Sequence, residues 1–279
     1  MRTSLLLTTC FLILGLCAKA QERIITAGSA ASEIVCALGD CDKIIGTDRT
    51  STYPGTLQSL PSIGYRNSIS AEGIISMRPD LIIVEEGYVK DELIEQLSST
   101  GIKTLMVEQK RSFEGTKGMI TEIAEVLGRK SEGKKLISTI ESDLSTLQER
   151  ISKIKKRPKV LCVYARGEGN MQVAGSNSPF SLLEFAGAQN AVPEIQGFKP
   201  LNAESLIIAN PDYVLFFDSG LQSLGGIEGA LEITGMKQVT AGKKKQIISM
   251  DGVLLTNWGP RVAQAAQELF KLTHPEYAE

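Results

Sequence analysis

Two similar stretches, SAEGIISMRPDLIIV (Ser70–Val84) and NAESLIIANPDYVLF (Asn202–Phe216), decide how this chain of 279 residues is organised. Each contains Ala-Glu, a helical apolar stretch, Pro-Asp and an apolar run, and the second copy follows the first by 132 residues (204 − 72 and 211 − 79). Continuous apolar runs of this kind are typical of strands buried on both faces. The repeat therefore predicts an equivalent helix–strand unit in each of two lobes.

A glutamate stands at the same place in both copies. Ser70 and Asn202 are residue types that cap helix N-termini, which puts Glu72 and Glu204 in the first helical turn. A carboxylate there complements the helix dipole by about 0.3–1 kcal/mol. For either helix taken alone this structural role is the preferred interpretation, and each Pro-Asp is interpreted as a helix stop and turn.

Helices and strands alternate around both copies of the repeat. Strands are expected at 23–27, 43–46, 81–84, 104–107, 160–164, 213–217 and 246–250. Shorter helices are expected at 30–38, 71–77, 89–99, 179–185, 204–209 and 262–272. Such alternation predicts an α/β fold with mostly parallel sheets.

One long helix is expected between the lobes. From about Ser131 to Lys156 the apolar residues step by three or four and form a single stripe: Leu136, Ile140, Leu144, Leu147, Ile151 and Ile154. At 1.5 Å per residue this helix spans roughly 35 Å, and Pro158 stops it. We therefore divide the chain into a signal peptide (1–20), an N-terminal lobe (21–130), the linking helix (131–157) and a C-terminal lobe (158–279).

The N-terminus predicts export. Met1-Arg2 is a basic start, Leu5–Leu16 is an apolar run too short to span a membrane, and Ala18-Lys19-Ala20 is a small-x-small cleavage site. Lipidation of Cys17 would require a small residue at the preceding position, which is occupied by Leu16. A soluble exported protein is therefore preferred to a lipoprotein.

The composition argues against several classes of function. The chain is 42% hydrophobic and 22% charged with a net charge of −2, so nucleic acid is not an expected partner. The chain has one histidine, His274, which we place in a C-terminal tail, and of its five cysteines three scattered ones follow the signal peptide. These numbers disfavour a zinc site and Cys–His or Ser–His catalysis. Of those cysteines, Cys36 and Cys41 either form a disulfide in an oxidising compartment or are apolar core residues, as Cys162 is expected to be.

Taken together, these motifs resemble the periplasmic substrate-binding proteins of ABC importers for haem, cobalamin and iron-siderophores. The repeated stretches, the linking helix and ITAGSAASEIVCALG (Ile25–Gly39) carry the resemblance, which covers the whole chain after the signal peptide. It implies two Rossmann-like lobes on one rigid helix, a ligand cleft between them, a periplasmic monomer and no catalysis. It also implies that Glu72 and Glu204 dock onto arginines of the two halves of an inner-membrane permease dimer with its ATPase.

The stretch GYRNSISAEG (Gly64–Gly73) resembles the haem-binding branch of this family. This resemblance implies that Tyr65 is an axial ligand of the haem iron. A phenolate oxygen is a hard ligand suited to ferric iron. Because free tyrosine has a pKa of about 10, the metal or a nearby cation must stabilise the phenolate. Arg66 is adjacent, although the branch often places its arginine one residue later, where this chain has Asn67.

A second stretch, MDGVLLTNWGPRVAQAA (Met250–Ala266), is also similar to haem transporters. It implies that Arg261 approaches a haem propionate or the axial tyrosine and that Trp258 packs on the porphyrin. On residue type alone, Arg261 suits a helix start equally well, and Trp258 suits a buried position better. A sixth iron ligand would be Met171, Arg166 or water, and a five-coordinate haem is the simpler expectation.

Three alternatives stay open. A cobalamin or ferric-siderophore binder of the same fold would give Tyr65 no role, and a siderophore cleft would tend to be lined by arginine or tryptophan. An α/β enzyme, such as a chelatase or a nitrogenase-like metallocluster protein, would need clustered cysteine or histidine ligands. A sensor or haem-scavenging lipoprotein would need a proper lipidation site.

Overall fold

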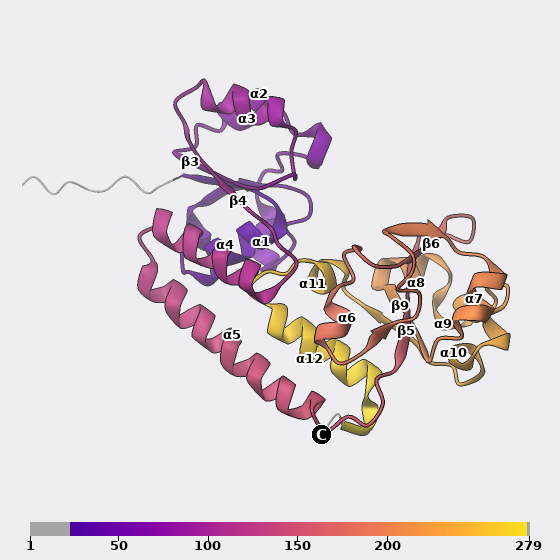
Figure 1. The fold of residues 1–279 in the computed structure, drawn as a ribbon. Coiled ribbons are helices and arrows are strands. Elements are labelled where there is room, and N and C mark those ends of the chain that lie inside the picture. Colours follow the sequence, from indigo (N-terminus) through magenta and orange to yellow (C-terminus); the bar gives the residue numbers. More distant parts are fainter. Residues whose placement is uncertain (1–22, 278–279) are drawn as a thin grey trace, which may run out of the picture.

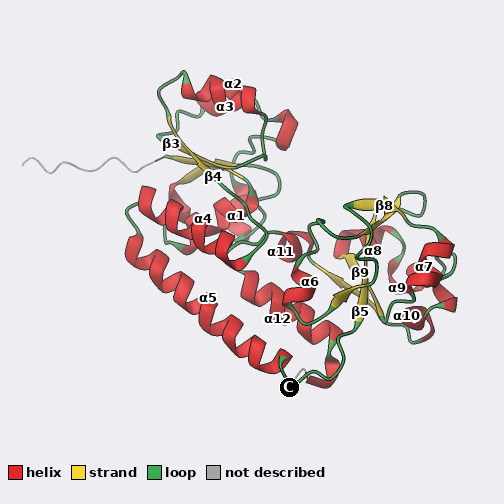
Figure 2. Ribbon diagram, viewed as in Figure 1, coloured by secondary structure: helices red, strands yellow, loops and turns green. Residues whose placement is uncertain are grey.

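The computed structural model describes residues 23–277, so the predicted signal peptide and Cys17 lie outside the described residues. Two sheets with helices on both faces form two lobes, and α5 (Lys130–Ile151) runs along their shared side (Figures 1 and 2). This arrangement confirms the predicted two-lobed α/β fold. None of the helices within residues 23–277 combines the length and the hydropathy needed to cross a bilayer.

The N-terminal sheet is parallel throughout, in the order β2 (Ile44–Thr47), β1 (Ile24–Ala27), β3 (Leu81–Glu85) and β4 (Lys103–Val107). Side chains alternate along a strand, so the apolar residues of β1 and β3 fill cores on both faces of the sheet. One face is covered by α1 (Ser29–Ala37) and α4 (Phe113–Val126), and the other by α2 (Ala71–Ser76) and α3 (Asp91–Ser98).

The C-terminal sheet is mixed. Its order is β10 (Ile247–Met250), β9 (Tyr213–Phe217), β5 (Lys159–Ala165), β6 (Met171–Ala174) and β8 (Phe198–Pro200), with the short β7 (Gln189–Asn190) also paired to β5. The first three strands are parallel, whereas β6 and β8 run antiparallel to their neighbours. The inner face is covered by α6 (Leu182–Phe185), α11 (Gly252–Thr256) and α12 (Val262–Thr273), and the outer face by α7 (Ala203–Ala209), α8 (Asp218–Ser223), α9 (Gly226–Leu231) and α10 (Thr240–Lys243).

One apolar core continues from the first sheet to the second. It joins Ile24 and Leu81 of the N-terminal sheet to Val160 and Leu215 of the C-terminal sheet through α5 and α12. Each lobe also has a separate outer core beneath its outer helices. Close-packed interiors resist relative displacement, so the lobes are coupled by shared packing as well as by α5.

The repeated stretches form equivalent units, α2–β3 and α7–β9. Ser70 Oγ accepts the main-chain N–H three residues further on at 3.2 Å, and Asn202 Oδ1 accepts its counterpart at 2.8 Å. Both residues therefore cap their helices as predicted. Glu72 and Glu204 lie exposed in the first turns.

The repeated Pro-Asp does more than turn the chain. Asp80 Oδ2 accepts the N–H of Arg23 at 2.9 Å, and Asp212 Oδ2 accepts the N–H of Lys159 at 2.9 Å. The N–H of Asp80 also donates to the carbonyl of Arg23, and the N–H of Asp212 to the carbonyl of Lys159, both at 2.8 Å. Each aspartate therefore anchors the start of the neighbouring central strand, β1 in one lobe and β5 in the other.

The linking helix ends earlier than predicted, at Ile151 instead of residue 157. Beyond it, Lys153 N–H and Ile154 N–H donate to carbonyls three residues back, both at 3.1 Å, which tightens the last turn. This turn packs Ile154 on Gly187, where a Cβ atom would lie 3.0 Å from Ile154 Cδ1. The predicted stripe is confirmed from Leu136 to Ile151, while Ile154 reaches the core from a turn.

The cysteines and the histidine have structural positions. Cys36, in the last turn of α1, forms a disulfide with Cys41 just beyond that helix, and Cys162 is a buried thiol in β5. His274 does not lie in a tail, as we expected, but is buried at the end of α12, where its ring stacks on Phe270 with centroids 4.7 Å apart. Burial lowers the pKa of this imidazole.

Candidate ligand-binding site

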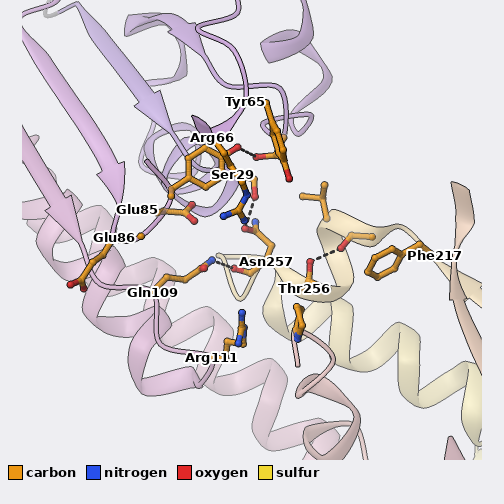
Figure 3. Close-up of a pocket in the computed structure, with 16 residues that line it drawn as sticks. Ser29, Tyr65, Arg66, Glu85, Glu86, Gln109, Arg111, Phe217, Thr256 and Asn257 are labelled. Carbon is orange, nitrogen blue, oxygen red and sulfur yellow. Dashed lines mark hydrogen bonds between the residues drawn. The ribbon is translucent and has the colours of Figure 1, made fainter. Parts of the chain in front are cut away.

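A cavity of about 510 Å³ lies between the lobes, where carboxyl ends of strands from both sheets meet (Figure 3). Open α/β sheets place ligand sites at this edge, and the volume is typical of small-molecule pockets. The N-terminal lobe lines it largely with polar side chains: Ser29, Thr50, Tyr65, Arg66, Glu85, Glu86, Tyr88, Gln109 and Arg111. The C-terminal lobe adds an apolar wall of Pro179, Phe217 and Val253, together with Thr256 and Asn257.

Tyr65 is the exposed aromatic residue on the N-terminal wall. Its side chain points into the cavity (Figure 3), and 45% of the residue is exposed. The guanidinium of Arg66 lies 5.7 Å from the centroid of the Tyr65 ring and 4.9 Å from that of Tyr88. Arg66 has a φ of 43°, an uncommon value for a residue with a side chain. This backbone places Arg66, and not Asn67, at the cavity.

Tyr88 is held differently from Tyr65. Its phenol donates a hydrogen bond to the carboxylate of Asp48 and lies 3.2 Å from Thr50 Oγ1. Burial and the neighbouring Asp48 carboxylate raise the pKa of Tyr88 well above its usual range. Tyr88 therefore keeps its proton, whereas no hydrogen bond within residues 23–277 engages the phenol of Tyr65.

Glu85 is a buried carboxyl group at the inner end of the cavity, only 4% exposed. Its Oε1 accepts the N–H of Ala31 at 3.0 Å, at the start of α1. It lies against Gly28, where a Cβ atom would come within 2.3 Å of the Glu85 Cδ. Burial raises the pKa of Glu85 to about 7, so its charge changes near neutral pH.

The cavity floor is also the seam between the lobes. Ser29 Oγ donates to Asn257 Oδ1 at 2.8 Å, and Gln109 Nε2 donates to the main-chain carbonyl of Asn257 at 2.8 Å. Thr116 Oγ1 donates to the carbonyl of Trp258 at 2.7 Å. The stretch Met250–Ala266, singled out in the sequence, therefore supplies the floor and fastens it to the N-terminal lobe.

Two residues predicted to contact the ligand belong to this seam instead of the cavity wall. Arg261 binds Glu33 through two hydrogen bonds of 2.8 and 2.5 Å and lies 3.8 Å over the ring of Tyr53. Trp258 is 4% exposed, donates to Ser181 Oγ at 3.2 Å and packs edge-on against Phe185. These contacts agree with the alternative interpretations, in which Arg261 is a helix-start residue and Trp258 is a buried packing residue.

The remaining C-terminal candidates are Arg166 and Met171. Arg166 follows β5, is exposed and lies 5.2 Å over the ring of Tyr164, which itself contacts Phe217. Met171 begins β6 and packs against the outer core of its lobe. Neither residue lines the cavity described above.

Most of the lining residues were not predicted from the sequence, among them Glu85, Arg111 and Phe217. Glu85 ends β3, one residue beyond the predicted strand, Phe217 ends β9, and Arg111 follows β4 by a few residues. Their position at or just after the ends of strands could have indicated them, because the carboxyl ends of parallel strands share one edge of a sheet. In the described part of the chain, no three His, Cys, Asp or Glu side chains are grouped to hold a metal ion.

The fold and the site define a class: a two-lobed binding protein with its ligand cavity between the lobes. Residues 24–254 match the periplasmic binding protein family, and the chain belongs to that family. The structure is similar to the periplasmic heme-binding protein RhuT from Roseiflexus sp. RS-1, with 34% identity, a TM-score of 0.86 and coverage of 92% of this chain and 99% of that chain.

Two further comparisons agree with this assignment. The periplasmic heme-binding protein HutB of Vibrio cholerae is 31% identical with a TM-score of 0.82, covering 92% of this chain and all of that one (100%). In sequence, the chain is 26% identical over 262 residues to the ABC transporter substrate-binding lipoprotein YvrC of Bacillus subtilis (strain 168), covering 92% of this chain and 82% of that protein. The chain is thus a periplasmic substrate-binding protein of an ABC transporter, in a family of binding proteins and not of enzymes.

Proposed function

We propose that this protein binds ferric haem in the inter-lobe cavity, with the Tyr65 phenolate as axial ligand of the iron, and delivers it to an inner-membrane permease. The observation that carries the proposal is the asymmetry of the cavity. One wall presents a tyrosine with an unengaged phenol beside an arginine, and the facing wall is apolar around Phe217. A flat apolar macrocycle with a ferric centre and an anionic edge matches both walls.

Charged side chains support specific roles in this proposal. In this proposal Arg66, whose guanidinium lies 5.7 Å from the centroid of the Tyr65 ring, stabilises the phenolate form of Tyr65, because a nearby positive charge favours the ionised phenol. Arg111 is exposed on the cavity lining and is suited to pair with a propionate. Arg261 is committed to Glu33, so we assign it no propionate.

Glu72 and Glu204 are proposed to contact the permease. Both are exposed in the first turns of equivalent helices, one in each lobe. Replacing both by alanine should leave haem binding intact and impair transport in reconstituted membranes. Normal transport by this double variant would reject the docking role.

The ligand assignment is tested by hemin titration of the purified protein, read in the Soret and charge-transfer regions. Tyr65→Phe should remove the charge-transfer band of ferric tyrosinate and weaken binding. Tyr53→Phe is the matched control, since Tyr53 is similarly exposed (48% against 45%) but lies on Arg261 outside the cavity lining. Saturable binding with an unchanged spectrum in Tyr65→Phe would move the iron ligand elsewhere. Saturation by cyanocobalamin but not by hemin would replace haem with cobalamin.

A further inference from the structure

Two exposed isoleucines occupy equivalent positions in the repeat. Ile75 in α2 and Ile207 in α7 are separated by the repeat offset of 132 residues, and they are 38% and 39% exposed. Each follows its glutamate by three residues and so neighbours it on the helix surface. Scattered single apolar residues are ordinary on protein surfaces. Recurrence at the same repeat position with the same exposure sets this pair apart.

The neighbouring carboxylates, those of Glu72 and Glu204, have no charged partner in the part of the chain that the structure describes. No salt bridge within residues 23–277 includes Glu72 or Glu204, although five of the pairs there involve other exposed glutamates on helices. Each helix thus presents an unpaired negative charge beside an exposed apolar side chain. The complementary surface is a cation beside an apolar patch.

We propose that Ile75 and Ile207, each with its glutamate, form two equivalent contacts with one partner of twofold symmetry, the permease dimer. The inference rests on the proposed function, because it assigns the partner from the transport role. A symmetric dimer offers the same surface twice, which matches a contact repeated in both lobes. Helices α2 and α7 lie in the outer layers of their lobes, away from α5 and α12 (Figure 1), so both contacts are open to a partner.

The charges and the isoleucines have separable effects. Exposed glutamates steer approach and orientation, and their influence is screened by salt. Apolar side chains buried in the complex slow dissociation. The C-terminal contact is the more apolar of the two, because Ile208, 76% exposed, stands where the first copy has Ser76. Substitutions in α7 should therefore weaken docking more than those in α2.

The test measures binding of the full-length mature protein to the permease–ATPase complex of the same importer in lipid nanodiscs. The variant Ile75→Ser/Ile207→Ser should raise the Kd about tenfold or more, chiefly through faster dissociation, at low and at high salt alike. Ile227→Ser in α9 is the matched control, with 43% exposure outside the repeat, and should bind as wild type. Ile75→Leu/Ile207→Leu should retain most of the affinity.

Wild-type affinity of the serine double variant would overturn the inference, as would an equal loss in Ile227→Ser. Hemin titration of the same preparations separates this outcome from failure of the proposed ligand. If the serine double variant loses permease affinity while wild-type protein takes up no haem, the docking contacts stand and the haem assignment fails.

Discussion

The ion pair between Arg261 and Glu33 leads to a specific prediction about how the lobes are held together. The Glu33 side chain is 1% exposed and that of Arg261 is 17% exposed, and the two residues are joined by two hydrogen bonds. Burial raises the pKa of Glu33, and the guanidinium opposes that shift. The substitution Arg261→Ala removes the cation and leaves a buried carboxylate at the seam.

The expected cost is large. Breaking a buried ion pair on one side destabilises proteins by about 3–5 kcal/mol. At about 2–4 °C per kcal/mol for a chain of this size, a loss of about 3 kcal/mol lowers Tm by about 6–12 °C. The raised pKa of Glu33 means that the folded variant binds more protons than the unfolded chain, whose carboxyl titrates near 4.5. Its stability therefore falls as pH rises above that value, and the deficit relative to wild type is smaller in acid.

The assay is urea denaturation at about pH 5 and about pH 8, where the stability difference between the two conditions follows from proton linkage. Arg166→Ala is the control, because Arg166 is exposed and its guanidinium lies over the ring of Tyr164, and it should change stability by no more than about 0.5 kcal/mol. The double variant Glu33→Gln/Arg261→Met should regain most of the lost stability. If Arg261→Ala and Arg166→Ala were equally stable and only Arg261→Ala lost hemin binding, the role of Arg261 between the lobes would be refuted and the propionate interpretation restored.

Three further predictions concern the cavity. Glu85→Gln should stabilise the protein above neutral pH by up to about 3 kcal/mol. The pKa of Glu85 is about 7 in the folded protein against 4.5 in the unfolded chain, so between these values the wild type loses about 1.4 kcal/mol of stability per pH unit as pH rises. Urea denaturation across this pH range that shows no gain for the variant would contradict the prediction. Tyr88→Phe should cost about 1.5–3 kcal/mol by removing a hydrogen bond to the Asp48 carboxylate, while hemin titration should still show the charge-transfer band that we assign to Tyr65. Gly28→Ala should destabilise in thermal unfolding, because Gly28 has a φ of 118° and a Cβ atom would overlap the Glu85 carboxyl; an unchanged Tm would show that this contact relaxes freely.

Much of the fold follows from local pattern. Apolar residues spaced by three or four predicted α5, and continuous apolar runs predicted β3 and β9. Burial of one stripe of a helix, or of both faces of a strand, produces a pattern among consecutive residues that can be recognised in the sequence. The repeat likewise predicted α2 and α7 with their caps. Helix α4 was missed because it contains Gly115 and Gly118. Gly115 is required by the turn that enters the helix, since a Cβ atom there would lie 2.4 Å from the carbonyl oxygen of Lys110, five residues earlier.

The sequence by itself therefore determined the two lobes, the linking helix and the exposed repeated glutamates, all of which depend on neighbouring residues in the chain. Only the tertiary structure decided which side chains meet. Arg261 and Glu33 are 228 residues apart, and the cavity draws Tyr65 and Phe217 from different sheets. No local pattern specifies such contacts, because they arise when packed elements from distant parts of the chain are brought to a common edge.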